Sequence, residues 1–128
     1  MRVLVDSSIW IDYFRSGAAS SELDALIQED LIVTNDIILA ELIPFLRMKK
    51  QAEIIALLEA VDKNTMKINW QEIIHFQTQC LASGANGMGL PDLIIAQNAL
   101  QNDCAMYALD KHFQQLHRII QVDLFSIL

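Results

Sequence analysis

The stretch "VLVDSSIWIDYF" (residues 3–14) holds a short apolar run, an aspartate and an amphipathic segment in immediate succession. Residues 2–5 are continuously apolar from Val3 onward, which is the pattern of a strand buried on both faces. Asp6 follows at the carboxyl end of this strand. Four large apolar residues then recur at helical spacing: Ile9, Trp10, Tyr13 and Phe14. The stretch therefore predicts a buried strand, a turn that carries Asp6, and a helix that ends near Ser16.

The alternation of strand and helix continues along the chain. Strands are predicted at residues 2–5, 31–35, 66–69, 104–109 and 119–124, and helices at 7–14, 20–28, 37–46, 51–61, 70–81 and 91–101. Pro44 is expected to kink or shorten its helix, because proline lacks the backbone donor. Short apolar strands that alternate with helices indicate a parallel sheet covered on both faces. We expect one α/β domain over residues 1–128, with three layers (α/β/α) and a central parallel sheet of four to five strands.

Composition narrows the class of protein. The chain has 128 residues, 53% of them hydrophobic, and a formal net charge of −7, which argues against nucleic-acid binding through a broad basic face. We expect no membrane span, and Asp6 comes too early for the apolar region of a signal peptide. A cytoplasmic location is therefore expected. Cys80 and Cys104 lack the spacing of metal ligands and are expected to be reduced thiols in the core.

Four carboxylates are expected to meet at one edge of the sheet. Asp6 and Asp110 each follow a strand, and the carboxyl ends of parallel strands share an edge, where the ligand site of such folds lies. Glu41 interrupts the apolar stretch "IILAELIPFL" (residues 37–46), on the predicted inward stripe of a helix. Asp92 falls in the first turn of the helix that begins at Pro91, on its apolar side. At about 4 Å apart, two such charges repel by about 4 kcal/mol at an effective dielectric constant of 20. A divalent cation, Mg²⁺ or Mn²⁺, would neutralise the cluster.

Each acid also has an interpretation that needs no metal. Asp92 could favour the dipole of its own helix, and Asp6 and Asp110 could end strands or cap helices. Glu41 could reach solvent at the edge of its stripe. The three histidines show no paired ligand spacing and are expected to have surface or packing roles: His75, His112 and His117. Ser7 and Ser8 have no histidine placed to activate them, so hydrogen bonding around Asp6 is the expected role.

The motifs "VLVDSSIWIDYF", "IILAELI", "GLPDLIIAQNAL" and "ALDKHF" resemble the four acidic motifs of PIN-domain ribonucleases, most closely those of VapC-type toxins of toxin–antitoxin pairs. The resemblance runs from residue 3 to about residue 113. It implies that Asp6, Glu41, Asp92 and Asp110 bind the metal and that Ser8 supports them. It also implies an RNA substrate, an antitoxin partner and a homodimer. Many relatives carry Ser or Thr two residues before the last aspartate, where this chain has Ala108.

The expected chemistry is metal-assisted hydrolysis of RNA phosphodiester bonds, with Mg²⁺ or Mn²⁺ as cofactor. One alternative is a catalytically silent module whose acids bind a basic partner segment, and Ala108 keeps that alternative open. Another alternative is a phospho-accepting receiver domain. It is disfavoured because Asp6 is a single acid after the first strand and because the predicted third strand, "MKIN", ends without one.

Overall fold

The structure is a computed structural model that describes residues 1–125. Three short strands, β1 (Val3–Val5), β2 (Ile32–Val33) and β3 (Ala105–Tyr107), form a parallel sheet in the order β2-β1-β3. The helices of this part of the chain are α1 (Ser7–Arg15), α2 (Leu23–Gln28), α3 (Asp36–Met48), α4 (Ala52–Glu59), α5 (Trp70–Ala82), α6 (Leu90–Gln101) and α7 (Lys111–Ile120). Each helix predicted from the sequence is present, and α7 is an additional one.

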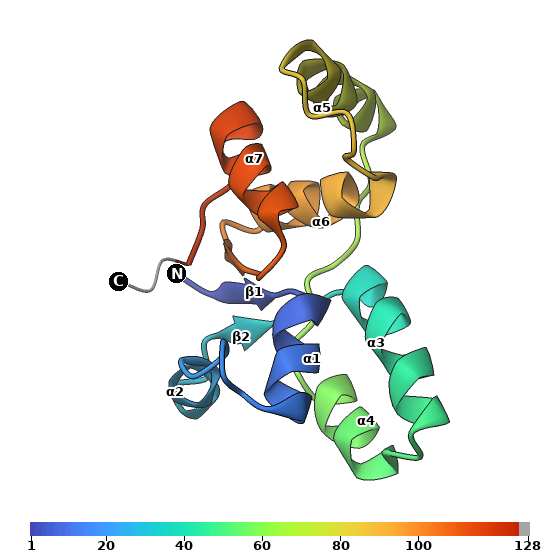
Figure 1. Cartoon of the computed structure of the whole chain (residues 1–128), viewed down its shortest axis with the longest axis vertical. Helices are drawn as coiled ribbons and strands as arrows, with labels where there is room; N and C mark the ends of the chain where they lie inside the picture. Colours follow the sequence, from blue (N-terminus) through green and yellow to red (C-terminus); the bar gives the residue numbers. More distant parts are fainter. Residues whose placement is uncertain (126–128) are drawn as a thin grey trace.

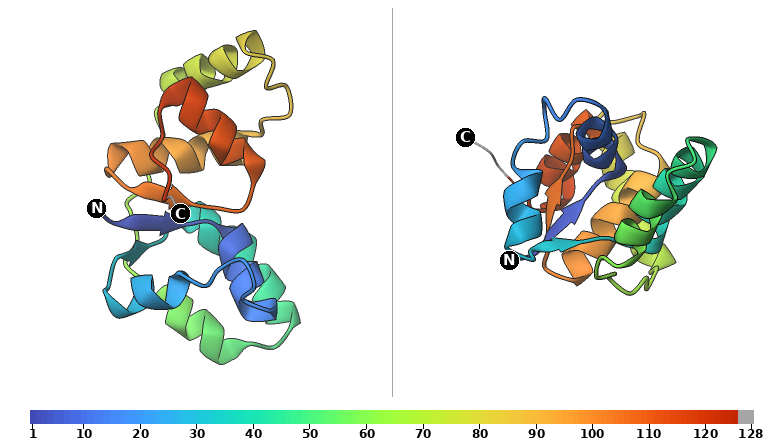
Figure 2. Two further views of the ribbon diagram at one scale, coloured as in Figure 1. Left: turned by 60° about the vertical axis from the view of Figure 1, so that its left-hand side comes forward. Right: turned by 90° about the horizontal axis from the view of Figure 1, so that it is seen from below.

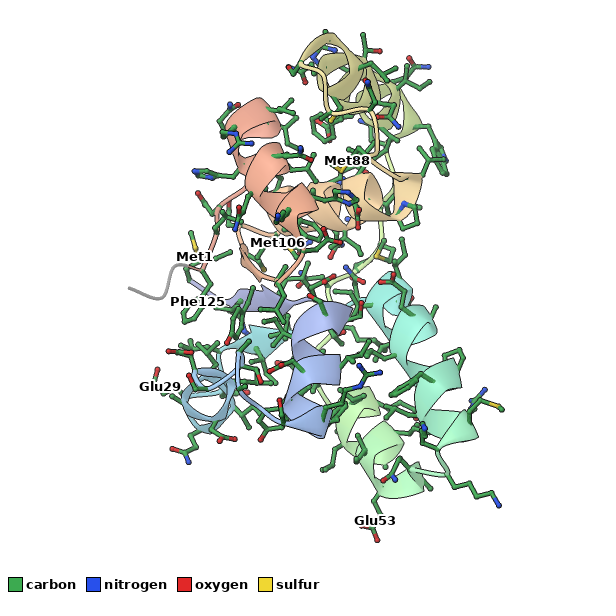
Figure 3. The ribbon with its side chains drawn as sticks, viewed as in Figure 1. Met1, Glu29, Glu53, Met88, Met106 and Phe125 are labelled. Carbon is green, nitrogen blue, oxygen red and sulfur yellow. The ribbon has the colours of Figure 1, made fainter. Side chains whose placement is uncertain are left out.

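Helices cover both faces of the sheet. Helices α1 to α4 lie on one side of β1 and helices α5 to α7 on the other, as two views show (Figures 1 and 2). The strands between them are fully apolar and buried, including all three residues of β1. Met88 and Met106 lie in the interior, whereas Glu29 and Glu53 project away from the ribbon (Figure 3). The predicted three-layer α/β/α architecture is confirmed.

The strand predicted at residues 66–69 is wrong. This segment runs extended along α6, and amide side chains of α6 bind its backbone in place of a neighbouring strand. The carbonyl oxygens of Thr65, Lys67 and Asn69 accept hydrogen bonds of 3.0, 2.8 and 3.1 Å from Asn98, Gln101 and Gln97 of that helix. Because these acceptors are satisfied by side chains, the segment lies outside the sheet although its alternating sequence resembles that of a strand.

The strand predicted at residues 119–124 is also wrong for most of its length. Ile119 and Ile120 complete α7, which ends where Gln121 adopts a left-handed conformation (φ 62°). The chain then touches β3 at one isolated bridge, Met106 to Leu124. The sheet described here therefore has three strands, where four to five were expected.

Helix α3 continues through Pro44 to Met48 and so is longer than expected. Pro44 deprives the Ala40 carbonyl of its partner within the helix, but both residues are exposed, so water can satisfy that oxygen. The buried Asn35 caps the start of the helix, and its side chain accepts a 2.9 Å hydrogen bond from the Ile38 amide. This cap fixes the start of the helix that carries Glu41.

Both cysteines are buried and free, as expected.

Within residues 1–125, no helix combines the length and the apolar character that a membrane span requires.

Candidate metal centre

Asp6 lies in the turn from β1 into α1 and is almost fully buried, with 5% of its surface exposed. Its backbone amide donates a 2.9 Å hydrogen bond to the Tyr107 carbonyl, which extends the pairing of β1 with β3. Its side chain caps α1, because Oδ2 accepts hydrogen bonds from the Ser8 amide at 3.2 Å and the Ser8 hydroxyl at 2.6 Å. The sheet thus fixes the backbone of Asp6, and Ser8 fixes its carboxylate.

Asp110 occupies the equivalent place after β3. It caps α7, since Oδ1 accepts a 2.9 Å hydrogen bond from the His112 amide. Because β1 and β3 are parallel neighbours, Asp6 and Asp110 lie at the same edge of the sheet, as predicted. Both also cap helices, so a capping role and a place in the acid cluster are compatible.

Ser8 links the two strand ends. Besides its bonds to Asp6, its hydroxyl oxygen accepts a 3.0 Å hydrogen bond from the backbone amide of Leu109, 101 residues later. This contact lies beside Ala108, where the resemblance to PIN-domain ribonucleases led us to expect a hydroxyl. One serine side chain therefore joins the turn that carries Asp6 to the turn that carries Asp110.

Glu41 lies at the edge of its helical stripe and not within it, which corrects the inward placement expected from the sequence. The neighbouring Ile38 and Leu42 are fully buried, whereas Glu41 is exposed as a whole residue. Burial of its carboxyl group nevertheless raises the pKa of Glu41, and the charges of Asp6 and Asp92 raise it further. The carboxyl end of Glu41 is therefore turned toward the other acids.

The pKa of Asp6 also depends on its neighbours. Burial raises the pKa of Asp6 above its ordinary value, hydrogen bonds from Ser8 lower it in part, and the charge of Asp92 raises it again. Asp92, in the first turn of α6, is thus close enough to influence both Asp6 and Glu41. Asp6, Glu41 and Asp92 are therefore close enough for their charges to interact.

His112 lies beside the site acids, a contact that the expectation of a surface or packing role did not include. Its Nδ1 lies 2.7 Å from Asp92 Oδ2 and 3.6 Å from Asp110 Oδ1. The hydrogen bond to Asp92 is the largest cause that raises the pKa of His112. Potential ligand atoms of Asp92, Asp110 and His112 all lie within 4.8 Å of one another, and this tightest group does not include Asp6 and Glu41.

A signal for His112 was present in the sequence. Asp110 is a good helix cap, and three apolar residues follow it at helical spacing: Phe113, Leu116 and Ile120. All three are buried against the core. The strand predicted at 119–124 concealed this helix and thereby the position of His112 in its first turn.

The clustered carboxylates have no basic partner other than His112 among residues 1–125. Arg2 pairs with Asp30 and Asp62, and Lys63 pairs with Asp36, all away from this cluster. Carboxylate oxygens with one imidazole nitrogen form a donor set that suits a divalent cation. The residues present therefore fit a metal centre.

This fold and site define an α/β protein with a cluster of acids at the carboxyl ends of a parallel sheet. The family model described as PIN domain matches residues 3–119, and the chain belongs to the PIN domain family. A comparison with curated protein sequences gave no match.

Solved structures with the same fold come from three bacteria. VapBC2 from Rickettsia felis, bound to a DNA fragment from their promoter, matches with a TM-score of 0.74 and 17% identity over 100% of both chains. FitAcB from Neisseria gonorrhoeae matches with a TM-score of 0.70 and 19% identity, covering 97% of this chain and 96% of that chain. VapC20 from Mycobacterium tuberculosis, a Sarcin-Ricin loop cleaving toxin, matches with a TM-score of 0.57 and 16% identity, covering 94% of this chain and 98% of that chain.

Proposed function

We propose that the protein is a metal-dependent endoribonuclease and the VapC-type toxin of a toxin–antitoxin pair. The observation that carries this proposal is the gathering of Asp6, Glu41, Asp92 and Asp110 from four distant segments, without a lysine or arginine ion pair among the described residues. So many acids in one place destabilise the protein unless a cation offsets them. A functional role for the cluster explains why the chain retains it.

The residues of the site have different proposed roles. Asp92 and Asp110 have potential ligand atoms within 4.8 Å of each other, and Asp6 and Glu41 would complete the set around them. A divalent cation bound there would polarise the scissile phosphodiester and activate the attacking water. The Ser8 hydroxyl donates to Asp6, so it orients a ligand and is not set up as a nucleophile. Without metal, the negative field of the acids would repel an RNA backbone.

The proposed substrate is RNA, and the proposed location is the cytoplasm, where that substrate is found. VapC20 is a Sarcin-Ricin loop cleaving toxin, and its similarity supports an RNA substrate for this chain. The VapBC2 structure, a pair bound to a DNA fragment from their promoter, supports an antitoxin partner. Which RNA is cut depends on contacts outside the acid cluster.

We also propose a homodimer. Helix α5 carries three exposed large apolar residues, Trp70, Ile74 and Leu81, whose spacing places them along one side of the helix. An exposed apolar stripe of this kind is typical of a surface that another molecule covers. Light scattering of the purified protein would show a mass twice that of one chain, and Ile74→Glu should reduce it to that of a monomer.

The decisive experiment is incubation of the purified protein with a pool of cellular RNAs, with Mg²⁺ or Mn²⁺ and with a chelator. Asp6→Ala and Asp92→Ala remove site acids, and Glu53→Gln is the control because Glu53 is an exposed acid that projects from α4 (Figure 3). We expect metal-dependent cleavage by the wild type and by Glu53→Gln, and none by the other two variants.

Two results would contradict the proposal. Full activity in excess chelator would exclude the metal-dependent scheme. An absence of cleavage under every metal, from folded protein free of bound inhibitor, would instead favour a silent module whose acids bind a basic partner segment.

A further inference from the structure

His112 is held beside the acids by the cap of its own helix. The Asp110 carboxylate accepts a 2.9 Å hydrogen bond from the His112 amide, which fixes the first turn of α7. The imidazole Nδ1 then lies 2.7 Å from Asp92 Oδ2 on α6 and 3.6 Å from Asp110 Oδ1. One ring nitrogen thus lies next to two carboxylates from different elements, with 36% of the His112 side chain exposed.

A hydrogen bond explains only one of these two contacts. The 2.7 Å contact to Asp92 has hydrogen-bond length, but the 3.6 Å contact to Asp110 exceeds it. In an octahedral centre with ligands at about 2.1 Å, neighbouring ligand atoms are about 3 Å apart. The two observed distances lie on either side of that value. A cation could therefore take the place of the shared proton after small side-chain shifts.

The position of the other histidines shows that this arrangement is particular to His112. The His117 ring nitrogen bonds the Val122 carbonyl at 2.7 Å, near the end of α7. His75 is an exposed residue of α5. Within residues 1–125, the grouping of potential ligand atoms includes His112 and neither of these two.

We propose that His112 is a nitrogen ligand of the metal centre, together with Asp92 and Asp110, and that it gives the centre a preference for Mn²⁺ over Mg²⁺. This inference rests on the proposed function, which requires a metal but is satisfied by either ion. Mg²⁺ strongly prefers oxygen ligands and keeps its waters, whereas imidazole nitrogen binds transition-metal ions more tightly. An imidazole in the ligand set therefore changes which cation the site selects.

The direct test is electron spin echo envelope modulation of Mn²⁺ bound to the full chain. Protein with natural histidine should show modulation from a ¹⁴N nucleus, and protein grown with ¹⁵N-histidine should show the changed frequencies of ¹⁵N. The modulation should be absent in His112→Asn and retained in the control His75→Asn. The labelled wild type gives an answer even if His112→Asn folds poorly.

Calorimetric titration gives a second readout that does not depend on cleavage. We expect His112→Asn to weaken Mn²⁺ binding by about 10- to 100-fold, the range for loss of a metal-site partner. Mg²⁺ binding should change by less than about 3-fold, because Mg²⁺ gains little from nitrogen.

The outcomes separate this inference from the proposed function. If wild-type protein binds Mn²⁺ without nitrogen modulation, and His112→Asn binds it equally well, His112 is only a hydrogen-bond partner of Asp92 and the inference is wrong, while the metal-dependent nuclease stands. If wild-type protein binds neither cation, both the inference and the proposed function are wrong.

Discussion

The Ser8 hydroxyl donates a 2.6 Å hydrogen bond to the Asp6 carboxylate from the first turn of α1. The same oxygen accepts the amide of Leu109, just before Asp110. Ser8 therefore orients one site acid and also fixes the turn that carries another. This side chain therefore adds a contact between two strand ends that the pairing of β1 with β3 already holds together.

Ser8→Ala should weaken Mn²⁺ binding by about 10- to 100-fold, because the partners of ligands commonly contribute this much. It should also lower the free energy of unfolding by about 1 kcal/mol for the lost hydrogen bonds. Titration calorimetry and denaturant unfolding measure the two effects. Ser8→Thr keeps the hydroxyl and should lie close to wild type, and equal metal affinity in Ser8→Ala would show that Asp6 needs no such support.

Asp6→Asn should stabilise the metal-free protein at pH 7 by about 0.5–2 kcal/mol, the usual gain when an unfavourable functional-site charge is removed. Asparagine also keeps the cap of α1. Burial raises the pKa of Asp6 in the folded state, so the folded protein holds this proton more tightly than the unfolded chain. Wild-type stability should therefore fall as pH rises from the ordinary pKa of 3.8 through the raised value.

The measurement is denaturant unfolding in chelator across that pH range. The advantage of Asp6→Asn over wild type should be full at neutral pH and should vanish below the ordinary pKa. Asp123→Asn, at an exposed position, is the control for the loss of a carboxylate outside the site. A constant difference between Asp6→Asn and wild type at every pH would rule out the charge as its cause.

Glu41→Gln should weaken metal binding by at least about tenfold, since it removes one of the site's charged oxygens while preserving its shape. Calorimetry and RNA cleavage with matched protein concentrations measure the effect, and Glu53→Gln is the control on another helix. Because Glu41 is exposed, the substitution should leave the fold intact, so that a loss of affinity reports on the metal site. If affinity and cleavage both stayed at wild-type levels, Glu41 would be a solvated acid at the edge of its helix.

Asn98→Leu should lower the free energy of unfolding by about 2–4 kcal/mol, because it removes the hydrogen-bond partner of the buried Asn35 side-chain amide and one partner of the Asn64 amide. The Asn98 side chain accepts hydrogen bonds from Asn35 at 2.9 Å and Asn64 at 3.3 Å, and donates one to the Thr65 carbonyl. Gln101→Ala on the exposed side of the same helix should cost less than about 1 kcal/mol. Equal effects of the two substitutions in denaturant unfolding would contradict a special role for the buried network.

The sequence predicted the layers and the placement of Asp6 and Asp110 because both depend on local patterns. An apolar run followed by an aspartate and a helix identifies a strand end in a parallel sheet. The extended segment at 66–69 was not predictable in this way, since three amides of α6 replace a strand as its hydrogen-bonding partners. Whether a segment joins a sheet depends on which elements pack beside it in the fold, and the periodicity of its own sequence does not show this.

The candidate site was likewise predicted only in part from the sequence. The acids stand out in the sequence because Asp6 and Asp110 follow apolar runs and Glu41 interrupts one. The contact of His112 with Asp92 was missed because it depends on α7 being a helix and on α6 bringing Asp92 within 2.7 Å. The edge position of Glu41 likewise follows from how α3 packs, and the apolar pattern around it predicted the opposite.

The pairing of β3 with β1 has a consequence for newly made copies of the protein. The first strand of the sheet acquires this neighbour only after nearly all of the helices have been synthesised, since β3 is the last strand in chain order. Until then Asp110 cannot lie beside Asp92, and Ser8 has no Leu109 amide to bind. A chain interrupted during synthesis, or cut before β3, would lack the assembled centre. Under the proposed toxin function, unfinished molecules would therefore lack the harmful activity.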